Sequence, residues 1–514
     1  MTSSLSLVAV GAVCLLTIVF GALGLRLSRA TSDFYVAGRS VSPRMNASAI
    51  GGEYLSAASF LGVAGLIYDF GVDQLWLPVG YTTGYLVLLV MVAAPMRRSG
   101  AYTVPDFAEA RLQSGRVRLV ASTLVVAIGW IYLVPQLQGA SLVLQIVADV
   151  PGWVGGTVVA IVVILAVGAG GMRSITFVQA VQYWIKLTAL AVPAFVIIVL
   201  WVRAGHPAPD VPSTSWEVAL TPRAEGDHPT YRVYSTLIAL SLGTMGLPHV
   251  LVRYYTNPDG NAARRTTVNV LLLLGLFYLL PPIYGVLGRV HLPTMPEGVR
   301  SDSIVLRLPG VVVGGLGGDL LTAVLAAGAF AALLSTASGV AMSVAGVLDQ
   351  SLMRPWVARL SGGDAGMPVG FRLAALAAVA VPYVVSRLVE PIGLATMVGL
   401  AFAVAASTFA PLLILGVWWR ALSTIGAIAG LLTGAVAATA AIFASIALRP
   451  VDGWPGWTGA LLSQPAAWSV PLATLVTVVV SLSTPASVPP GTTRLLVRLH
   501  TPEGVDVSRS RPDD

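Results

Sequence analysis

A run of apolar sequence near the N-terminus is interrupted by Gly51-Gly52-Glu53-Tyr54-Leu55-Ser56-Ala57-Ala58-Ser59-Phe60-Leu61-Gly62. Two adjacent glycines, a carboxylate and several hydroxyls are unusual in a helix that faces lipid. A charge at mid-bilayer costs a few kcal/mol on insertion scales and is usually retained for function. Non-helical backbone at that depth is tolerated only where protein or a watery cavity covers it. The run therefore predicts a discontinuous helix lining a central site, although its small residues alone would fit close helix packing equally well.

The composition is that of a polytopic helical membrane protein. Of the 514 residues, 56% are hydrophobic and only 10% are charged, whereas soluble chains are about 25% charged. The net charge of +7 does not indicate nucleic-acid binding, because most arginines fall in short loops, as the positive-inside rule requires. The single cysteine, Cys14, lies in an apolar run, so there is no disulfide framework and no thiolate metal site. The first run, 5–25, is too long for a signal-peptide core and is expected to be a mature helix.

About thirteen segments approach or exceed the roughly 20 apolar residues that a membrane crossing requires. They lie near 5–25, 45–69, 74–96, 118–148, 152–172, 175–203, 231–255, 267–288, 315–350, 370–386, 391–418, 422–447 and 467–484. With the N-terminus outside the cell, most basic loops and the basic tail fall inside. The exceptions, which fall outside, are Arg289, Arg300, Arg307 and Arg387. This balance predicts a multi-pass protein of the cell membrane with an external N-terminus and a cytoplasmic C-terminus.

The remaining segments give the domain organisation. Residues 99–116 are expected to form a short cytoplasmic amphipathic piece, and the Pro-rich residues 205–229 an external loop. A single membrane domain is predicted over 1–485. The tail, 486–514, contains Pro489-Pro490 and is expected to be cytoplasmic and disordered. No segment is suited to a soluble catalytic domain.

A second interruption occurs in the seventh apolar segment, at Gly243-Thr244-Met245-Gly246-Leu247-Pro248-His249. The first interruption lies in the second segment, five segments earlier. Breaks at corresponding places in two halves are typical of inverted-repeat transporters, in which the broken helices flank one site near the membrane midplane. We therefore expect two five-helix repeats, 45–203 and 231–418. A simple proline kink at Pro248 is the alternative.

The ninth segment carries adjacent hydroxyls in Ala331-Ala332-Leu333-Leu334-Ser335-Thr336-Ala337-Ser338. Hard cations such as sodium prefer oxygen ligands, which hydroxyls and freed backbone carbonyls supply without adding charge. Ser335 and Thr336 could both reach one neighbouring break. The alternative is that each hydroxyl bonds back to the preceding turn of its own helix.

Several strings resemble the sodium/solute symporter family over roughly 1–485. They are Asp33-Phe34-Tyr35-Val36-Ala37-Gly38-Arg39, Gly246-Leu247-Pro248-His249-Val250-Leu251-Val252-Arg253 and Ser335-Thr336. The strings 54–62 and 397–407 and Gly246-Leu247-Pro248-His249 are similar to the cation/acetate (monocarboxylate) branch. The resemblance implies an all-α, leucine-transporter-like fold with a five-plus-five inverted repeat, one extra N-terminal helix and two C-terminal helices.

The resemblance also implies a sodium site. Its ligands would be the carbonyls of Gly52, Leu55 and Ala332 and the hydroxyls of Ser335 and Thr336. The family's second sodium site uses an aspartate where this chain has Gln179, so that site is not predicted. Tyr54 replaces an aspartate of the proline-transporting branch. Acetate-type members commonly have an acidic residue at the position of Glu53, which leaves proton coupling through Glu53 open.

Further polar residues are candidates for the substrate pathway or for coupling. Lys186 lies four residues after Gln182, on the expected same face of a helix. It could attract a carboxylate, pair with Glu53, or extend to an aqueous boundary. For His249 a structural hydrogen bond is the better interpretation, and Arg39 and Arg253 are expected to be boundary anchors. The complete candidate set for pathway and coupling is Glu53, Tyr54, Ser56, Gln136, Gln182, Lys186, Gly246 and His249.

The sequence thus predicts a secondary active symporter in which inward sodium flow drives uptake of acetate, propionate or pyruvate. The alternative substrate is another small solute such as proline, with sodium or proton coupling. An enzyme is not predicted, because no metal-binding cluster, nucleophile elbow or phosphate loop occurs; a channel is disfavoured by the matched breaks. The expected partners are a small organic anion and the lipid bilayer. No nucleic acid, no obligate protein partner and no cofactor other than the coupling Na+ are expected.

Overall fold

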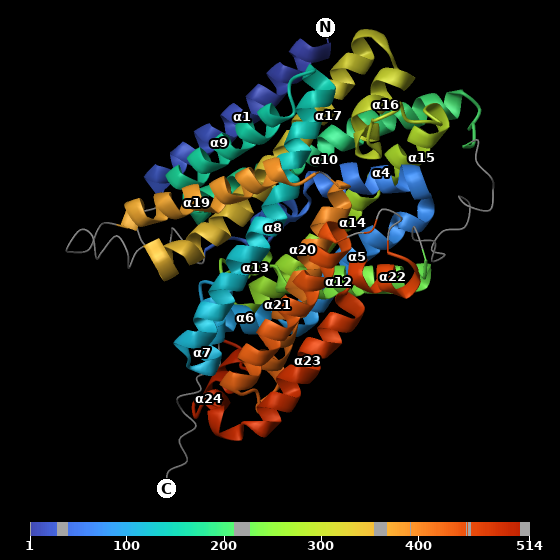
Figure 1. The fold of residues 1–514 in the computed structure, drawn as a ribbon. Coiled ribbons are helices and arrows are strands. Elements are labelled where there is room, and N and C mark those ends of the chain that lie inside the picture. The colour runs from blue at the N-terminus through green and yellow to red at the C-terminus, as the bar shows by residue number, and fades with distance from the viewer. Residues whose placement is uncertain are drawn as a thin grey trace.

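The computed structural model describes residues 2–27, 37, 40–209, 227–353, 367–390, 392–448, 450 and 454–503. The regular structure in these ranges is helical, and the helices pack into one elongated bundle (Figure 1). The long unbroken helices are α1 (Thr2–Leu27), α8 (Gly115–Ala148), α10 (Met172–Arg203), α17 (Gly315–Leu348), α19 (Met367–Leu388), α20 (Leu394–Trp418), α21 (Thr424–Ala447) and α23 (Ala466–Ser483).

Both predicted breaks are confirmed. The first lies between α3 (Pro43–Tyr54) and α4 (Leu61–Phe70), with a short 3-10 turn, η2 (Ala57–Ser59), between them, and it bends the chain by 81°. Helix α3 ends where Leu55 leaves helical geometry (ψ 81°) and Ser56 becomes extended. The second break separates α12 (Pro229–Gly246) from α13 (Pro248–Tyr254) with a bend of 47°. Leu247 is extended there, as expected for the residue before a proline.

Shorter helices complete the described fold. Helix α5 (Trp76–Met91) follows the 3-10 turn η3 (Val72–Leu75), and α14 (Gly260–Tyr278) is continued by α15 (Pro281–His291). Helix α7 (Val104–Leu112) begins at a capping box between Thr103 and Asp106 and occupies the predicted amphipathic piece. The others are α6 (Ala93–Ser99), α9 (Trp153–Ala169), α16 (Ile304–Val312), α22 (Gly456–Ser463) and α24 (Thr492–His500).

The multi-pass helical class is confirmed. Within the described ranges, 10 helical runs are long and apolar enough to cross a membrane, and 12 if each bent pair counts as one span. Helix α9, with 17 residues, is shorter than these. Each of the thirteen predicted segments overlaps at least one helix of the structure. The count of thirteen crossings and the five-plus-five repeat stay predictions.

The loops predicted to be cytoplasmic meet at one end of the bundle. Arg97 donates to the carbonyls of Asn257 and Pro258, and the Arg111 Nε lies 2.9 Å from the Gly416 carbonyl oxygen. The Arg118 guanidinium lies 3.1 Å from the Gln350 side-chain oxygen. These contacts put several loops that are far apart in the sequence at the same end of the bundle, and the side of the membrane that this end faces stays a prediction.

The C-terminal tail corrects one prediction. Residues 492–500 form helix α24, which packs beside α6 and α7 at this same end (Figure 1). Leu499 is buried, and Arg111 lies 3.0 Å from the Thr492 hydroxyl. The expectation of disorder is therefore wrong for this part of the tail. The tail sequence alone does not show that Arg98 of α6 and Arg111 of α7 are hydrogen-bond partners for an amphipathic helix.

Some predictions concern residues outside the described ranges. They include most of the string 33–39 with Arg39, most of the loop 205–229, and the tail beyond 503.

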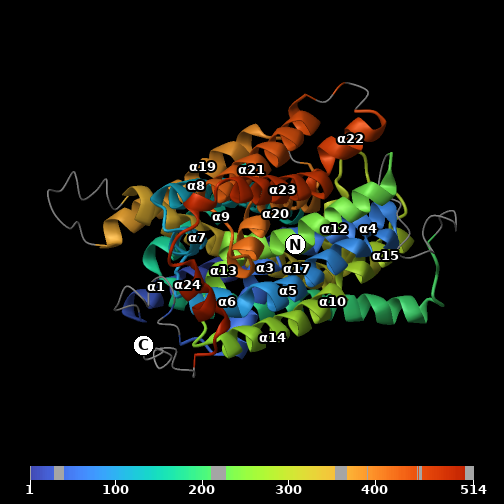
Figure 2. The same ribbon diagram turned by 90° about the horizontal axis from the view of Figure 1, so that it is seen from below.

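Helix α17 forms the centre of the fold. Nearly all of its residues from Leu325 to Leu348 are buried, and its principal partners include α1, α8 and α10. In the view from below, α3, α13 and α17 lie near the middle, with other helices around them (Figure 2). The two breaks therefore adjoin one of the most deeply buried helices that the structure describes.

Candidate functional site

The end of α3 makes close contact with α10 and α17. A side chain at Gly52 would collide with the carbonyl of Gln179 on α10, and a side chain at Gly339 on α17 would collide with Glu53. Gly52 is therefore required for the two backbones to approach this closely, whereas Gly339 leaves room for the Glu53 side chain. The close approach brings the freed carbonyls of the break against side chains from two long helices.

The predicted hydroxyls do reach the first break. Ser335 donates a hydrogen bond to the carbonyl of Gly52, and the Thr336 hydroxyl lies 2.6 Å from the Glu53 carbonyl oxygen. Ser335 is held in turn by Gln179, whose amide nitrogen lies 2.8 Å from the Ser335 carbonyl oxygen. Ala332 is fully buried on the preceding turn of α17. The structure therefore attaches the two predicted hydroxyls to the break rather than to their own helix.

Lys186 also lies at this break. Its ammonium donates to the carbonyl of Gly52 and lies 2.6 Å from the carbonyl oxygen of Leu55. The side chain is fully buried, so it does not extend to an aqueous boundary. It also makes no ion pair with Glu53, which is paired with Arg253 instead. Two of the predicted sodium ligands are thus bound by a cationic side chain.

This arrangement does not fit a sodium ion beside Lys186 on the same carbonyls. A sodium ion bound there would lie within about 4 Å of the ammonium, where two unit charges repel by about 4 kcal/mol at an effective dielectric constant of about 20. Such a repulsion lowers affinity roughly a thousandfold. The Gly52 and Leu55 carbonyls can serve the ammonium or a sodium ion, but not both together.

The carboxylate of Glu53 is paired with Arg253. The two groups lie 2.5 Å apart, and both side chains are almost completely buried. Arg253 also donates to Gln179 and lies 2.7 Å from the Thr176 hydroxyl. The interpretation of Arg253 as a boundary anchor is therefore wrong, because its guanidinium turns inward to the only charge of opposite sign described at the break. Gln179, which the sequence left without a role, holds both Arg253 and Ser335.

The charges described at the first break do not balance. Lys186 and Arg253 supply two positive charges and Glu53 one negative charge, which leaves one positive charge when all three are ionised. Buried charges are stable only when paired or strongly hydrogen-bonded. A small anion at this point would complete the balance.

An aromatic cluster extends from the first break to the second. The Tyr54 hydroxyl lies 2.7 Å from the Thr244 hydroxyl of α12, and the Tyr54 ring lies 4.8 Å from that of Tyr85. Tyr132 on α8 lies 4.9 Å from the His249 ring on α13. The cluster is joined through Phe402 of α20 and consists of Tyr54, Tyr81, Tyr85, Tyr132, His249, Tyr278 and Phe402. It connects the two broken helices across the centre of the molecule.

Several polar atoms in and around this cluster are buried without a hydrogen-bond partner among the described residues. They are Tyr81 Oη, Tyr85 Oη, Gln136 Oε1, His249 Nε2 and Ser338 Oγ. The Ser56 hydroxyl interacts with that of Tyr132, and the Tyr278 hydroxyl with that of Ser59. Buried polar groups are nearly always satisfied, so a group of unsatisfied ones needs an explanation. Hydroxyl donors enclosed by aromatic rings are suited to a small polar ligand with an apolar side.

Two other candidates serve packing in this structure. Gly246 ends α12, and a side chain there would collide with the carbonyl of Ala405 on α20. Gln182 lies apart from the break, with its amide nitrogen 3.0 Å from the Thr17 hydroxyl on α1. Gln182 and Lys186 therefore contact different neighbours, although they are one turn apart.

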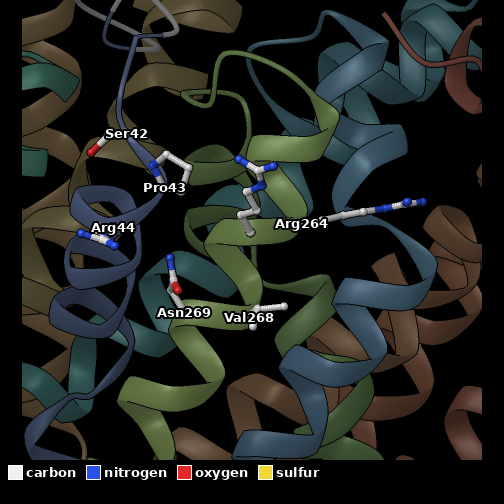
Figure 3. Close-up of a pocket in the computed structure, with 7 residues that line it drawn as sticks. Ser42, Pro43, Arg44, Arg264, Val268 and Asn269 are labelled. Atoms are coloured by element: carbon white, nitrogen blue, oxygen red, sulfur yellow. The ribbon is translucent and has the colours of Figure 1, made fainter.

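A basic cavity of about 540 Å³ lies elsewhere, between the start of α3 and the second and third turns of α14 (Figure 3). It is lined by Ser42, Pro43, Arg44, Arg264, Arg265, Val268 and Asn269. Two turns of α3 separate it from Gly52, which corresponds to roughly 12 Å along the helix. The cavity lies among basic loops at one end of the bundle, so it is separate from the aromatic cluster at the centre.

The tyrosines of α5 and α14 and the role of Gln179 were not predicted from the sequence. Tyr81 and Tyr85 are four residues apart and so share one helix face, which was the available signal. Nothing in the sequence distinguished that face from a lipid-facing one at a membrane boundary, where tyrosine is also common.

Known proteins similar to this chain are transporters. The sequence model of the Sodium:solute symporter family matches residues 34–434. The chain is 30% identical over 469 residues to the uncharacterized symporter YwcA of Bacillus subtilis, covering 89% of this chain and 90% of that protein. It is also 30% identical over 484 residues to the monocarboxylic acid transporter of Corynebacterium glutamicum, covering 87% and 86%.

Solved structures share the fold at low sequence identity. A Na+-coupled sialic acid symporter in its substrate-bound outward-open state superposes with a TM-score of 0.67 at 15% identity, covering 94% of this chain and 97% of that one. MhsT in complex with L-phenylalanine gives a TM-score of 0.53 at 14% identity, covering 85% and 98%. These neighbours have the leucine-transporter fold that the sequence resemblance implied. The chain belongs to the sodium:solute symporter family and is a membrane symporter rather than an enzyme.

Proposed function

We propose that this symporter takes up a small monocarboxylate such as acetate, propionate or pyruvate. The observation that carries the proposal is the unbalanced positive charge at the first break, close to buried hydroxyls without partners. A carboxylate supplies both the missing negative charge and acceptors for hydroxyl donors. The similarity to a monocarboxylic acid transporter supports the same substrate class.

The surroundings favour a small substrate with an apolar tail. Tyr54, Tyr85 and Phe402 present ring faces and edges around the break. Methyl, ethyl and acetyl groups fit against such rings, whereas a larger polar solute would leave its own groups unpaired. An amino acid such as proline is the alternative. Its ammonium would need a free carboxylate, and Glu53 is already paired with Arg253.

Transport would follow the alternating-access scheme of inverted-repeat symporters. The broken helices α3/α4 and α12/α13, one from each of the proposed repeats 45–203 and 231–418, would move against α17 and expose the central site to each side in turn. The N-terminus would face outward and the C-terminus the cytoplasm, with the protein in the cell membrane.

Cation coupling would act through the region where α3 meets α10 and α17. Sodium is the coupling ion that family membership implies. A sodium ion could use the carbonyls of Gly52 and Leu55, together with Ala332, Ser335 and Thr336, only in a state from which the Lys186 ammonium has left them. One charge that enters across 100 mV provides roughly 2.3 kcal/mol, which is enough for appreciable accumulation of a substrate.

Competition in proteoliposomes tests the substrate class. Purified protein should take up radiolabelled acetate, and excess unlabelled propionate or pyruvate should inhibit this uptake while proline should not. If proline inhibits and propionate and pyruvate do not, the proposed monocarboxylate is wrong and the alternative substrate, a small solute such as proline, is supported. Liposomes without protein provide the background.

A further inference from the structure

We propose that the ammonium of Lys186 is a built-in cation that takes the place of a sodium ion at the break of α3. This inference rests on the proposed function, because it concerns the coupling region of the same transport site. It predicts that uptake needs no sodium at Gly52 and Leu55, and that removal of the lysine uncovers a sodium site there.

The first support is the position of the ammonium. Helix α3 ends at Tyr54, and the last carbonyls of a helix lack intrahelical partners and carry partial negative charge. A cation is the expected occupant of such an end, and discontinuous transporter helices use it for coupling ions. The Lys186 ammonium binds the Gly52 and Leu55 carbonyls, the same pair that the sodium prediction requires.

The second support is the packing that delivers the lysine to this point. Gly52 lets the α3 backbone rest directly against the Gln179 carbonyl on α10, and Gly328 of α17 adjoins Ala189 of α10 in the same close way. The Lys186 side chain is completely buried between these helices. Its charge therefore faces the break.

The third support is the neighbouring charges. The charged groups described around the Lys186 ammonium are Glu53 of α3 and Arg253 of α13, and these two are paired with each other. The partners of the Lys186 ammonium are thus backbone carbonyls, as the ligands of a bound metal cation would be. Ser335 donates to the Gly52 carbonyl as well, so the lysine and α17 together hold α3 without a diffusible ion.

A tethered cation changes what the site contributes to transport. Because a side chain does not cross the membrane, this site would carry no ion during the cycle. The contact between α3 and its neighbours would also form at any sodium concentration. Uptake would then be driven by an ion that binds elsewhere in the protein.

The first experiment measures labelled acetate uptake by wild-type proteoliposomes in sodium chloride and in choline chloride of equal ionic strength, with a pH gradient imposed in both. Equal rates support the inference, because no sodium is then required at Gly52 and Leu55. If uptake depends on sodium, the Ser335→Ala variant decides the outcome. An unchanged half-saturating sodium concentration places the ion elsewhere and supports the inference. A rise of roughly tenfold, about 1.4 kcal/mol for a lost ligand, assigns sodium to this site and overturns the inference. Failure of all acetate uptake would instead count against the proposed function.

The second experiment removes the lysine and measures binding without transport. Sodium should raise the thermal unfolding temperature of purified Lys186→Ala protein, relative to choline, since a ligand that binds the folded state stabilises it. The shift should be absent in wild type and lost again in Lys186→Ala/Ser335→Ala. The control is Tyr183→Phe, which removes a different buried polar group of α10, one bonded to the Leu273 carbonyl. A sodium shift of equal size in wild type and Lys186→Ala, abolished in both by Ser335→Ala, would contradict the inference.

Discussion

At the scale of single residues, the interaction at the site whose loss should destabilise the protein most is the buried ion pair of Glu53 and Arg253. Loss of one partner leaves an uncompensated buried charge, which typically costs about 3–5 kcal/mol. Glu53→Gln should therefore lower the thermal unfolding temperature in detergent strongly. The double variant Glu53→Gln/Arg253→Met, which removes both charges, should recover much of the loss. Strictly additive effects of the two substitutions would show that the pair is not coupled.

The unpaired tyrosine hydroxyls make a separate prediction. Because the Tyr85 hydroxyl has no partner among the described residues, Tyr85→Phe should leave stability nearly unchanged. If that hydroxyl binds the substrate carboxylate, the KM for acetate should rise by roughly tenfold, as expected for a hydrogen bond to a charged group.

Tyr284→Phe is the matched control. The Tyr284 hydroxyl lies 2.7 Å from the Leu190 carbonyl oxygen, away from the aromatic cluster, so its loss should reduce stability and leave the KM unchanged. Equal effects of the two substitutions on the KM would remove Tyr85 from the substrate site.

Residue roles were only partly predictable from the sequence. The hydroxyls of Ser335 and Thr336 were placed correctly, because adjacent hydroxyls in an apolar helix suit a neighbouring break. Gln182 and Lys186 share a predicted face but contact α1 and α3 respectively. A long side chain chooses among neighbours within its reach, and the sequence does not show which neighbours are present. For the same reason the inward turn of Arg253 was not predicted.

At the scale of helices, the close approach of α3 and α10 depends on Gly52. A methyl group there would displace one backbone from the other, because it meets the Gln179 carbonyl rather than a flexible side chain. Gly52→Ala should therefore destabilise the protein by about 1–3 kcal/mol and reduce uptake sharply. Thermal unfolding and acetate uptake measure the two effects.

Gly275→Ala on α14 is the control for that substitution. Gly275 faces open space, so alanine there should be neutral or slightly stabilising. A normal uptake rate in Gly52→Ala would mean that the helices need not touch at this point during transport.

Helix breaks were easier to predict than helix partners. A glycine pair with a carboxylate, and a proline after Gly246-Leu247, are local signals that remain in the sequence whatever the surroundings. Helix α24 was missed because its stability depends on partners remote in the chain, such as Arg98, whose guanidinium lies 3.4 Å from the Leu499 carbonyl oxygen.

At the scale of the whole molecule, the loop arginines predicted which loops share an end of the bundle. The structure confirms that grouping through contacts of Arg97, Arg111 and Arg118. The proposed orientation is tested by single cysteines in a Cys14→Ala background. Thr294→Cys should react with a membrane-impermeant maleimide in intact cells, and Thr493→Cys only after permeabilisation. The opposite labelling pattern would invert the topology.

The central claim is that the region between the two breaks carries out coupled uptake of a small monocarboxylate. The most direct measurement is the time course of labelled acetate in proteoliposomes under an imposed inward cation gradient, with sodium and proton gradients applied separately. We predict transient accumulation above the external concentration under at least one gradient, followed by decline as that gradient dissipates. Equilibration without overshoot under both gradients, at a rate that neither gradient changes, would contradict symport by this protein.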